Sequence, residues 1–269
     1  MQIKTFIINA FTNKAFSGNP AGVCLLDSKL DEKIMQAIAS ELNLSETAFL
    51  HKKENEEAYR IRYFTPTVEI DFCGHATLAS AKLVLGKLGK KEVVFITKNG
   101  LKISAYNQGR SIKMEFPLYE TVDYEMNESL FDAFGIKETT TSQYCKELDM
   151  LIIEVADKQS LLQISPDFKK AIESSTTIKE VVITTKSEDI DYDFYSRCFC
   201  PWIGINEDPV TGASHSVLAK YWGQKLNKKE MSAYQLSNRG GFLKMKIVND
   251  NKLEVFSNAQ IVFEGLLNL

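Results

Sequence analysis

Two short stretches of the sequence combine a glycine, a histidine and small residues in a way that could support chemistry. In "DFCGHATLASA", Gly74 and His75 follow Cys73, and in "DPVTGASHSVLA", Gly212 shortly precedes His215. These stretches hold two of the three histidines of the chain. In each, an extended run leads into small residues that are typical of a helix start.

A helix start of this kind can bind an anion. The first turn of a helix leaves backbone N–H groups unpaired and carries partial positive charge. A glycine there allows a ligand to approach the backbone closely. Two such turns facing one cleft would favour a small carboxylate, with binding expected at residues Gly74, His75, Ala76, Thr211, Gly212, Ala213 and Ser214. The alternative is that both are tight turns with ordinary N-caps, Thr77 and Ser214.

The polar residues of these stretches suggest different roles. His75 could exchange a proton or a hydrogen bond with a substrate, since an imidazole titrates near neutrality, or it could be a packing residue. His215 lies further into a helical register and is expected to be structural. Asp208 precedes Pro209, so it should be extended. It could orient the turn or bind an amine or hydroxyl of a substrate.

A third candidate is the carboxylate of Glu46 in "ELNLSETAFL". Apolar neighbours such as Leu44 and Phe49 should destabilise the charged form and raise the pKa of Glu46 toward neutrality. Such a group suits a general acid/base that takes up a proton and returns it. Alternatively, Glu46 and Ser45 stabilise a helix-to-strand junction. The sequence leaves both interpretations open.

A metal or cofactor site receives little support. Cys73, His75, Cys198, Cys200 and His215 offer ligands that zinc prefers. Cys198 and Cys200, two apart in a strand, should point to the same face, but their spacing is not that of structural zinc sites. No Walker loop or G-x-G-x-x-G motif occurs. The sequence therefore predicts neither a metal nor a cofactor.

Composition excludes several classes of protein. The 269 residues carry a net charge of −3 with scattered basic residues, which argues against nucleic-acid binding. No apolar run has the length of a membrane span. The first residues alternate like a strand and lack a signal-peptide cleavage region, and five cysteines without framework spacing suit a reducing compartment. We expect a cytoplasmic protein.

The middle of the chain repeats its beginning. Phe64 and Pro66 match Phe199 and Pro201 at one common offset, and the offset between Gly74 and Gly212 is nearly the same. "NGLKISAYN" likewise resembles "GFLKMKIVN". Two copies of one fold explain this best. The expected domains are residues 1–117, joined by a returning strand at 260–269, and residues 118–259, with a polar connector over 121–142.

Each copy should be rich in strands. Alternating or β-branched runs such as "YRIRYFT", "EVVFITK", "MLIIEVA" and "KEVVITT" predict strands, and Asn99-Gly100 predicts a hairpin turn. Amphipathic helices are expected over 31–42, 76–87 and 217–226. The predicted class is therefore α+β, with two pseudo-symmetric halves that each wrap a curved, barrel-like sheet around a central helix.

Five motifs in order along nearly the whole chain carry a resemblance to a known family. They are "AFTNKAFSGNPAGV", "NLSETAF", "RYFTPTVEIDFCGHATLA", "GINEDPVTGASHS" and "SNRGG". With them the chain resembles the phenazine-biosynthesis PhzF-like isomerases. The resemblance implies a diaminopimelate-epimerase-like fold with an active site in the interdomain cleft. It also implies proton transfer without a cofactor on a small carboxylated substrate, cyclic or amino-acid-like, and pairing into a homodimer.

The resemblance also implies roles for single residues. Glu46 matches the catalytic carboxylate, His75 and Asp208 match its active-site partners, and Asn19 lies in a substrate-binding motif. Two departures stand out. The family pattern "DPVTGSAH" has Ala213 and Ser214 exchanged here, so a hydroxyl expected at 213 is displaced. Related epimerases use two cysteines; Cys73 matches the first, but the second falls at Pro209, which disfavours a two-cysteine mechanism.

Two functions from different classes remain. One is an isomerase in which Glu46 moves a proton between carbons of a small carboxylate. The other is a non-catalytic protein of the same fold that binds a small carboxylate or another protein. The set Glu46, His75 and Asp208 favours the enzyme, since binding alone needs no carboxylate in apolar surroundings.

Overall fold

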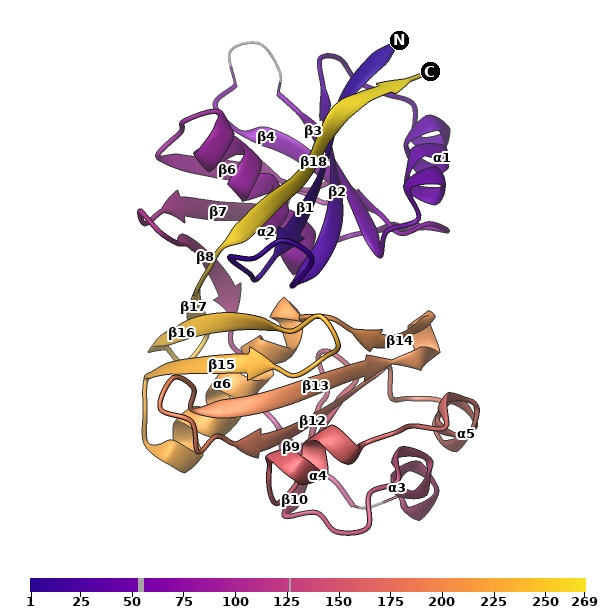
Figure 1. Ribbon diagram of the computed structural model, residues 1–269, viewed down its shortest axis with the longest axis vertical. Helices are drawn as coiled ribbons and strands as arrows, with labels where there is room; N and C mark the ends of the chain where they lie inside the picture. Colours follow the sequence, from indigo (N-terminus) through magenta and orange to yellow (C-terminus); the bar gives the residue numbers. More distant parts are fainter. Residues whose placement is uncertain (53–55, 126) are drawn as a thin grey trace. The chain divides into compact units, whose positions relative to one another are not determined.

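The chain forms two compact units. The computed structural model describes residues 1–52, 56–125 and 127–269. Unit 1 comprises Met1–Glu115 and Val255–Leu269, and unit 2 comprises Phe116–Glu254 (Figure 1). The chain thus crosses between units after residues 115 and 254. The boundaries predicted from sequence were residues 117 and 259.

Unit 1 is built mainly from strands with two helical segments. Its elements are β1 (Gln2–Ala10), β2 (Asn19–Leu26), α1 (Glu32–Leu42), β3 (Glu46–His51), β4 (Tyr59–Phe64), β5 (Glu69–Ile70), α2 (Gly74–Ala81), a π-helical continuation (Lys82–Lys87), β6 (Glu92–Ile96), β7 (Lys102–Asn107), β8 (Ile112–Pro117, which extends past the boundary) and β18 (Ala259–Asn268).

Unit 2 has the same kinds of element and more helices. They are β9 (Val122–Asp123), α3 (Glu128–Phe134), β10 (Thr141–Cys145), β11 (Met150–Glu154), α4 (Lys158–Gln163), α5 (Phe168–Ser174), β12 (Glu180–Lys186), β13 (Phe194–Cys200), a short 3-10 turn (Pro201–Ile203), β14 (Ile205–Asp208), α6 (Gly212–Leu226), β15 (Glu230–Gln235), β16 (Gly241–Asn249) and β17 (Lys252–Ser257, which crosses into unit 1).

The two units share one strand topology. In unit 1, β2 pairs parallel with β3, β3 and β5 pair antiparallel with β4, and β4 pairs parallel with β6, which continues antiparallel into β7. In unit 2, β11, β12, β13, β14, β15 and β16 follow the same order and directions. The repeat predicted from sequence therefore appears as a repeated pairing pattern.

Register extends the correspondence to single residues. Thr47 pairs with Phe64 in unit 1, and Val181 pairs with Phe199 in unit 2. The residue before each first partner, Glu46 or Glu180, is in both cases the first residue of its strand. The two glutamates therefore occupy equivalent positions in the repeat.

Each of the two glycine turns leads into a helix. Gly74 is the first residue of α2, and Gly212 is the first residue of α6. Both helices are largely buried, as expected for the central helix of a curved sheet, and α2 is buried from His75 to Ala81. Within the described residues, no helix combines the length and apolar character needed to cross a membrane.

The connector expected over residues 121–142 is wrong. Apart from Met126, which lies outside the described residues, this stretch contains β9, α3 and the start of β10. Asn127 caps α3 by accepting from the Leu130 N–H, and Phe131 and Phe134 are buried in the core of unit 2. With six or seven residues each, α3, α4 and α5 are too short to show a helical period in the sequence.

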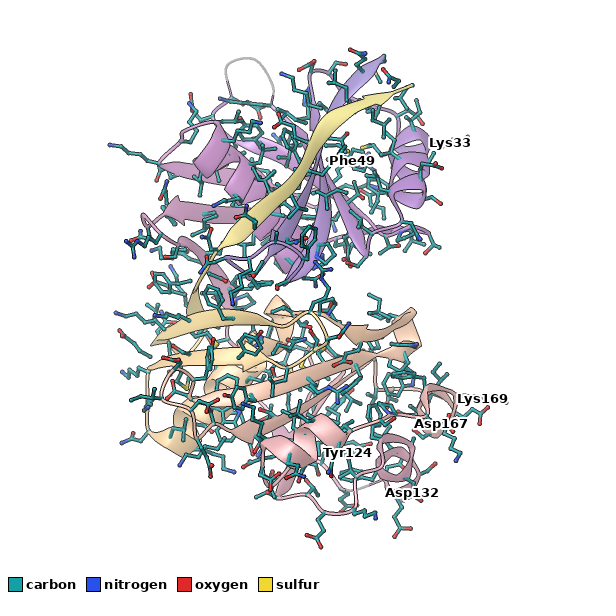
Figure 2. The ribbon with its side chains drawn as sticks, viewed as in Figure 1. Lys33, Phe49, Tyr124, Asp132, Asp167 and Lys169 are labelled. Carbon is teal, nitrogen blue, oxygen red and sulfur yellow. The ribbon has the colours of Figure 1, made fainter. Side chains whose placement is uncertain are left out.

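Separate apolar clusters fill the two units. In unit 1, Phe49 on β3 packs edge-on against Phe64, while Lys33 of α1 is exposed (Figure 2). In unit 2, the rings of Phe134 on α3 and Phe199 on β13 also make an edge-on contact.

The C-terminal strand belongs to unit 1. β18 pairs antiparallel with β1 from Gln2↔Asn268 to Ala10↔Ala259, with one irregularity after Ile7, so the yellow and indigo strands run side by side in Figure 1. The Met1 ammonium also donates to the Leu269 carbonyl. Without β18, the outer edge of β1 would expose its unpaired backbone groups.

Removal of residues 260–269 should therefore destabilise the protein. The deletion leaves most of the backbone groups on one edge of β1 unpaired, each pairing being worth about 1 kcal/mol, so we expect the melting temperature to fall by about 10 °C or more. Differential scanning calorimetry measures this. Deletion of Asn268 and Leu269 alone is the matched control and should change the melting temperature by about 2 °C at most. Equal melting of the long truncation and the full chain would show that β18 contributes nothing.

Candidate functional site

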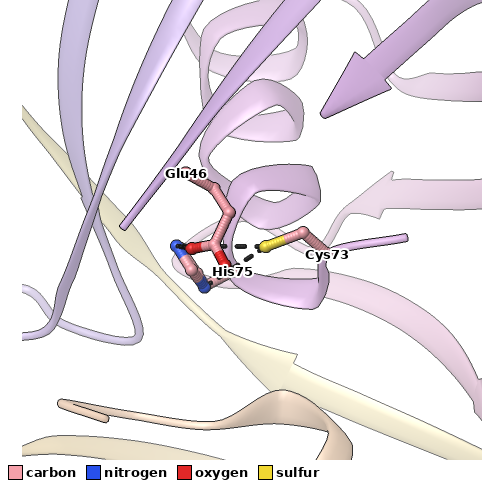
Figure 3. Close-up of side chains that lie close together, drawn as sticks. All are labelled: Glu46, Cys73 and His75. Carbon is pink, nitrogen blue, oxygen red and sulfur yellow. Dashed lines mark hydrogen bonds and ion pairs between the residues drawn. The ribbon is translucent and has the colours of Figure 1, made fainter. Parts of the chain in front are cut away.

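Two predicted site residues, Glu46 and His75, meet Cys73 in unit 1. Glu46 begins β3, His75 lies in the first turn of α2, and Cys73 is the residue directly before that helix (Figure 3). The His75 Nε2 lies 3.1 Å from Glu46 Oε2, and the Cys73 Sγ lies 3.4 Å from His75 Nδ1. Residues from two separate parts of the sequence therefore form one contact cluster.

Neighbouring strands hold this cluster in place. β2 runs parallel to β3 and pairs Ala21 with Glu46, which brings Asn19, the first residue of β2, to the cluster. The Asn19 Nδ2 lies 3.3 Å from His75 Nδ1, and the Ser45 hydroxyl donates to the Asn19 Oδ1 at 3.5 Å. Asn19, which the resemblance placed in the substrate site, thus touches the imidazole.

Hydrogen bonds of Thr77 stabilise the start of α2. The Thr77 hydroxyl donates to the Cys73 carbonyl at 2.6 Å and lies 2.6 Å from the Tyr63 hydroxyl. Thr77 is therefore not the N-cap that the alternative interpretation required, since Cys73 occupies that position. The helix start is held by a side chain from β4.

Burial of the cluster is nearly complete. The exposed fractions are 8% for Glu46, 7% for His75 and 7% for Cys73, while Asn19 is fully buried. A charge in such surroundings is costly unless an opposite charge compensates for it. The contact between Glu46 and His75 supplies that compensation.

The predicted rise in the pKa of Glu46 is wrong. Burial does raise it, as the apolar neighbours suggested, but the charge of His75, its close contact with the carboxylate and the Ser45 hydroxyl outweigh burial and lower the pKa of Glu46 overall. The apolar neighbours adjoin Glu46 in the sequence, whereas the imidazole comes from α2, a separate element. Glu46 is therefore a carboxylate at neutral pH.

His75 is correspondingly protonated. Burial alone would lower its pKa, but the neighbouring Cys73 and Glu46 raise the pKa of His75 well above its ordinary value of 6.5. The Nε2–Oε2 pair is within ion-pair distance, although its N–H direction is not aligned for a hydrogen bond to that oxygen. The cluster thus presents an ionised carboxylate beside an imidazolium.

This ion pair links stability to pH. Because the folded pKa of His75 is raised, its contribution is complete below about pH 6.5 and is lost as the pH rises through the folded value. Because the folded pKa of Glu46 is lowered, its contribution is present above about pH 4.5 and is lost as the pH falls through the folded value.

Cys73 is neither a good nucleophile nor part of a suitable metal site. Burial raises the pKa of the Cys73 thiol, which disfavours the thiolate. Donor atoms of Glu46, Cys73 and His75 all lie within 4.8 Å of one another. However, an imidazolium has no lone pair for a metal, and Glu46 already compensates its charge.

The predicted residues of unit 2 form a second arrangement. Asp208 ends β14, as expected for an extended residue, and its carboxylate accepts from the Thr211 hydroxyl. Gln235 on β15 holds the turn: its Nε2 donates to the Asp208 carbonyl at 2.7 Å, and its Oε1 accepts from the Thr211 N–H at 3.0 Å. Gln235 could not be predicted from sequence, because nothing there ties it to a turn on the other side of α6.

The exchange of Ala213 and Ser214 changes what the turn exposes. The Ser214 side chain is fully buried and its hydroxyl donates to the Thr211 carbonyl at 2.9 Å, while Ala213 is half-buried. The more exposed position therefore carries a methyl group. His215 is structural as expected: its Nδ1 donates to the same carbonyl at 2.7 Å, and burial lowers the pKa of His215 to about 4.

The structure also revises the position equivalent to Cys73. Thr211 directly precedes α6, as Cys73 directly precedes α2, so Thr211 and not Pro209 is its counterpart in the repeat. Thr211 has no thiol, so a two-cysteine mechanism stays disfavoured.

Comparison with known proteins agrees with this architecture. The family model described as phenazine biosynthesis-like protein (PhzC-PhzF) matches residues 8–265. An uncharacterized isomerase of Halalkalibacterium halodurans is 43% identical over 255 residues and covers 93% of each chain. A crystal structure of a PhzF-family phenazine biosynthesis protein from Enterococcus faecalis superimposes with a TM-score of 0.92 at 34% identity, covering 100% of both chains.

The chain belongs to the PhzF family. The resemblance seen in the motifs is therefore confirmed, and so is the diaminopimelate-epimerase-like fold. A hydroxyproline epimerase from Agrobacterium vitis shares the fold at 13% identity, with a TM-score of 0.59 over 99% of this chain and 92% of that one. These relatives support an isomerase in general terms.

The protonation states of the cluster can be measured without a substrate. We expect the imidazole signals of His75 in a nuclear magnetic resonance titration to keep their protonated shifts well above pH 6.5, and those of His215 to stay neutral down to about pH 4. Because the sequence has three histidines, replacement of each by Gln assigns the signals.

Glu46→Gln should lower the pKa of His75, since burial then acts without a compensating carboxylate. Glu41→Gln, an exposed change in α1, is the control and should leave it unchanged. An unshifted His75 titration in Glu46→Gln would contradict the ion pair.

Gln235→Leu tests the support of the second turn. The change leaves the Asp208 carbonyl and the Thr211 N–H without their partner, so we expect a loss of about 2–4 kcal/mol in the free energy of unfolding. Urea denaturation measures it. Gln224→Leu makes the same substitution on the exposed face of α6 and should have an effect close to zero. Similar losses in the two variants would remove the supporting role of Gln235.

Proposed function

We propose that this protein is a cofactor-independent isomerase that moves a proton between carbons of a small carboxylated metabolite. The observation that carries the proposal is the buried 3.1 Å contact between Glu46 and His75, which lowers the pKa of Glu46 and raises that of His75. A carboxylate held in the basic form in a dry site can accept a proton from carbon, and an adjacent cation stabilises the negative charge that results.

The proton transfer has two steps. Glu46 takes a proton from a carbon next to an electron-withdrawing group, so the C–H bond breaks and its electron pair stays on the substrate as a delocalised carbanion. Glu46, now a carboxylic acid, returns the proton to another carbon of the same molecule. Neither oxidant nor reductant is required. His75 remains protonated throughout and lowers the energy of the anionic intermediate.

The substrate class follows from the surroundings. The start of α2 provides backbone N–H groups next to the carboxylate, and Asn19 provides an amide. These groups favour an anionic substrate, most simply a carboxylate. The proposal assigns substrate binding to residues Asn19, Gly74, His75, Ala76, Thr211, Gly212, Ala213 and Ser214, and assigns Asp208 to an amine or hydroxyl. We further propose that the protein is cytoplasmic and forms a homodimer.

Solvent-deuterium incorporation tests the reaction. The protein is incubated in deuterium oxide with a panel of cyclic and amino-acid carboxylates, including proline and trans-4-hydroxy-L-proline, and exchange is followed by mass spectrometry and proton resonance. We expect exchange into at least one compound of the panel. Glu46→Gln should reduce it by a factor of about 10² or more, because the amide keeps the shape but cannot carry the proton.

Two controls separate chemistry from structure. Glu41→Gln should exchange at the normal rate, since Glu41 is exposed on α1. Circular dichroism should show that Glu46→Gln keeps the fold. Binding of a carboxylate by the wild-type protein without any exchange would favour the non-catalytic binding protein. Near-normal exchange in Glu46→Gln would make Glu46 a structural residue.

A further inference from the structure

Unit 2 contains a second cluster, of two buried thiols and a half-buried carboxylate, that the proposed reaction does not use. Glu180 is the first residue of β12, and Cys198 and Cys200 lie on the neighbouring strand β13. Val182 pairs with Cys198, so Glu180, two residues earlier, falls opposite Cys200 on the same face. Within the described residues, two sets of three His, Cys, Asp or Glu side chains bring potential metal-ligand atoms within 4.8 Å of one another. They are these three residues and the Glu46 cluster.

The distances in this cluster are short. The Cys198 Sγ lies 3.9 Å from the Cys200 Sγ and donates to the Glu180 Oε1 at 2.8 Å. The two thiols point to the same face, as predicted for alternate residues of a strand. A third strand adds a carboxylate nearby, because Asp208 of β14 pairs with Cys198.

The sulfur separation fits two ligands of one metal ion. Two thiolates bound at about 2.3 Å to a tetrahedral zinc ion lie about 3.8 Å apart. The observed 3.9 Å matches this value, whereas a disulfide requires about 2.05 Å. The Glu180 oxygen would have to move, since an oxygen and a sulfur on the same ion lie about 3.6 Å apart. Rotation of the carboxylate away from Cys198 supplies that movement.

The surroundings concentrate groups that a cation would satisfy. Cys198 is fully buried and Cys200 is 4% exposed. Thiolates and a carboxylate are among the ligands that a zinc ion prefers.

We propose that Glu180, Cys198 and Cys200 bind one zinc-like divalent metal ion. Both thiols lose their protons to solvent on binding, and the two thiolates and the carboxylate occupy three positions of a tetrahedral site. Water fills the fourth position. The site shares no residue with the Glu46 cluster. In that cluster the third side chain is the imidazolium of His75, which has no lone pair for a metal.

The two clusters differ in the third side chain, which joins a glutamate and a cysteine in each unit. Glu46 and Glu180 occupy equivalent strand positions, each with a cysteine close to its carboxylate. In unit 1 the third member is the imidazole of His75, which carries the compensating charge itself. In unit 2 the third member is a second thiol, so no cation is built in. The equivalent glutamates therefore meet different partners: an imidazole of α2 in unit 1 and two thiols of β13 in unit 2.

Cobalt and zinc titrations of the full-length protein test the proposal. The reduced protein is stripped with a chelator and titrated with Co²⁺, whose thiolate complexes absorb in the near ultraviolet. We expect one Co²⁺ per chain with this charge-transfer band, and its displacement by one equivalent of Zn²⁺. Competition with a chromophoric chelator gives the zinc affinity, which should fall by about 10²-fold or more in Cys198→Ser and in Cys200→Ser.

Matched variants place the ion. Cys73→Ser removes a buried thiol from the other cluster, and Cys145→Ser removes a buried thiol that belongs to neither; each should bind Co²⁺ like the wild type. Glu180→Gln should keep part of the charge-transfer band, since both thiolates remain, but should bind zinc about tenfold more weakly.

The wild-type protein alone can overturn the proposal, so it does not depend on folding of the variants. A reduced, stripped protein that binds neither Co²⁺ nor Zn²⁺ contradicts it. So does a charge-transfer band that survives in Cys198→Ser and Cys200→Ser but disappears in Cys73→Ser. Formation of a Cys198–Cys200 disulfide under air, with no metal bound after reduction, would assign the pair to oxidation instead.

Discussion

The buried contact between Glu46 and His75 is the interaction on which the rest of the site depends. Either group alone would be neutral at this depth, because burial raises the pKa of a carboxyl and lowers that of an imidazole. Together they stay charged, and removal of one partner from such a pair typically costs about 3–5 kcal/mol. The strand order that sets β3 beside β2, and the side chains that fix the start of α2, act together to hold this pair at 3.1 Å.

The pair also decides what chemistry the fold offers. An ionised carboxylate is a base from the outset, so no proton must leave Glu46 before a substrate reacts. A high pKa, which the apolar neighbours suggested, would instead have stored the proton on Glu46 and made it an acid first. The imidazolium of His75 reverses that order. Its charge acts on Glu46 through space, because His75 lies on α2, a helix that begins well after β3 in the chain.

Much of the fold could be predicted from sequence because its signals are local. Strand alternation, the Asn99-Gly100 turn and the glycines at the starts of α2 and α6 each involve a few consecutive residues. The parts that were missed depend on distant contacts: Gln235 supports a turn from another strand, and Glu180 meets two cysteines across a strand pair. The repeat was the one available signal for Glu180, because its offset from Glu46 is close to that between Phe64 and Phe199.

The return of β18 to β1 has a consequence for the order in which the protein acquires structure during translation. Val255–Leu269 completes unit 1 but is synthesised after all of unit 2. Unit 2 is one continuous segment, so all of its strands leave the ribosome before β18 does. Unit 1 must wait with β1 open along one edge until its last strand emerges. The N-terminal half, although made first, is therefore the last to be finished, and chaperones that shield exposed strand edges would act on it.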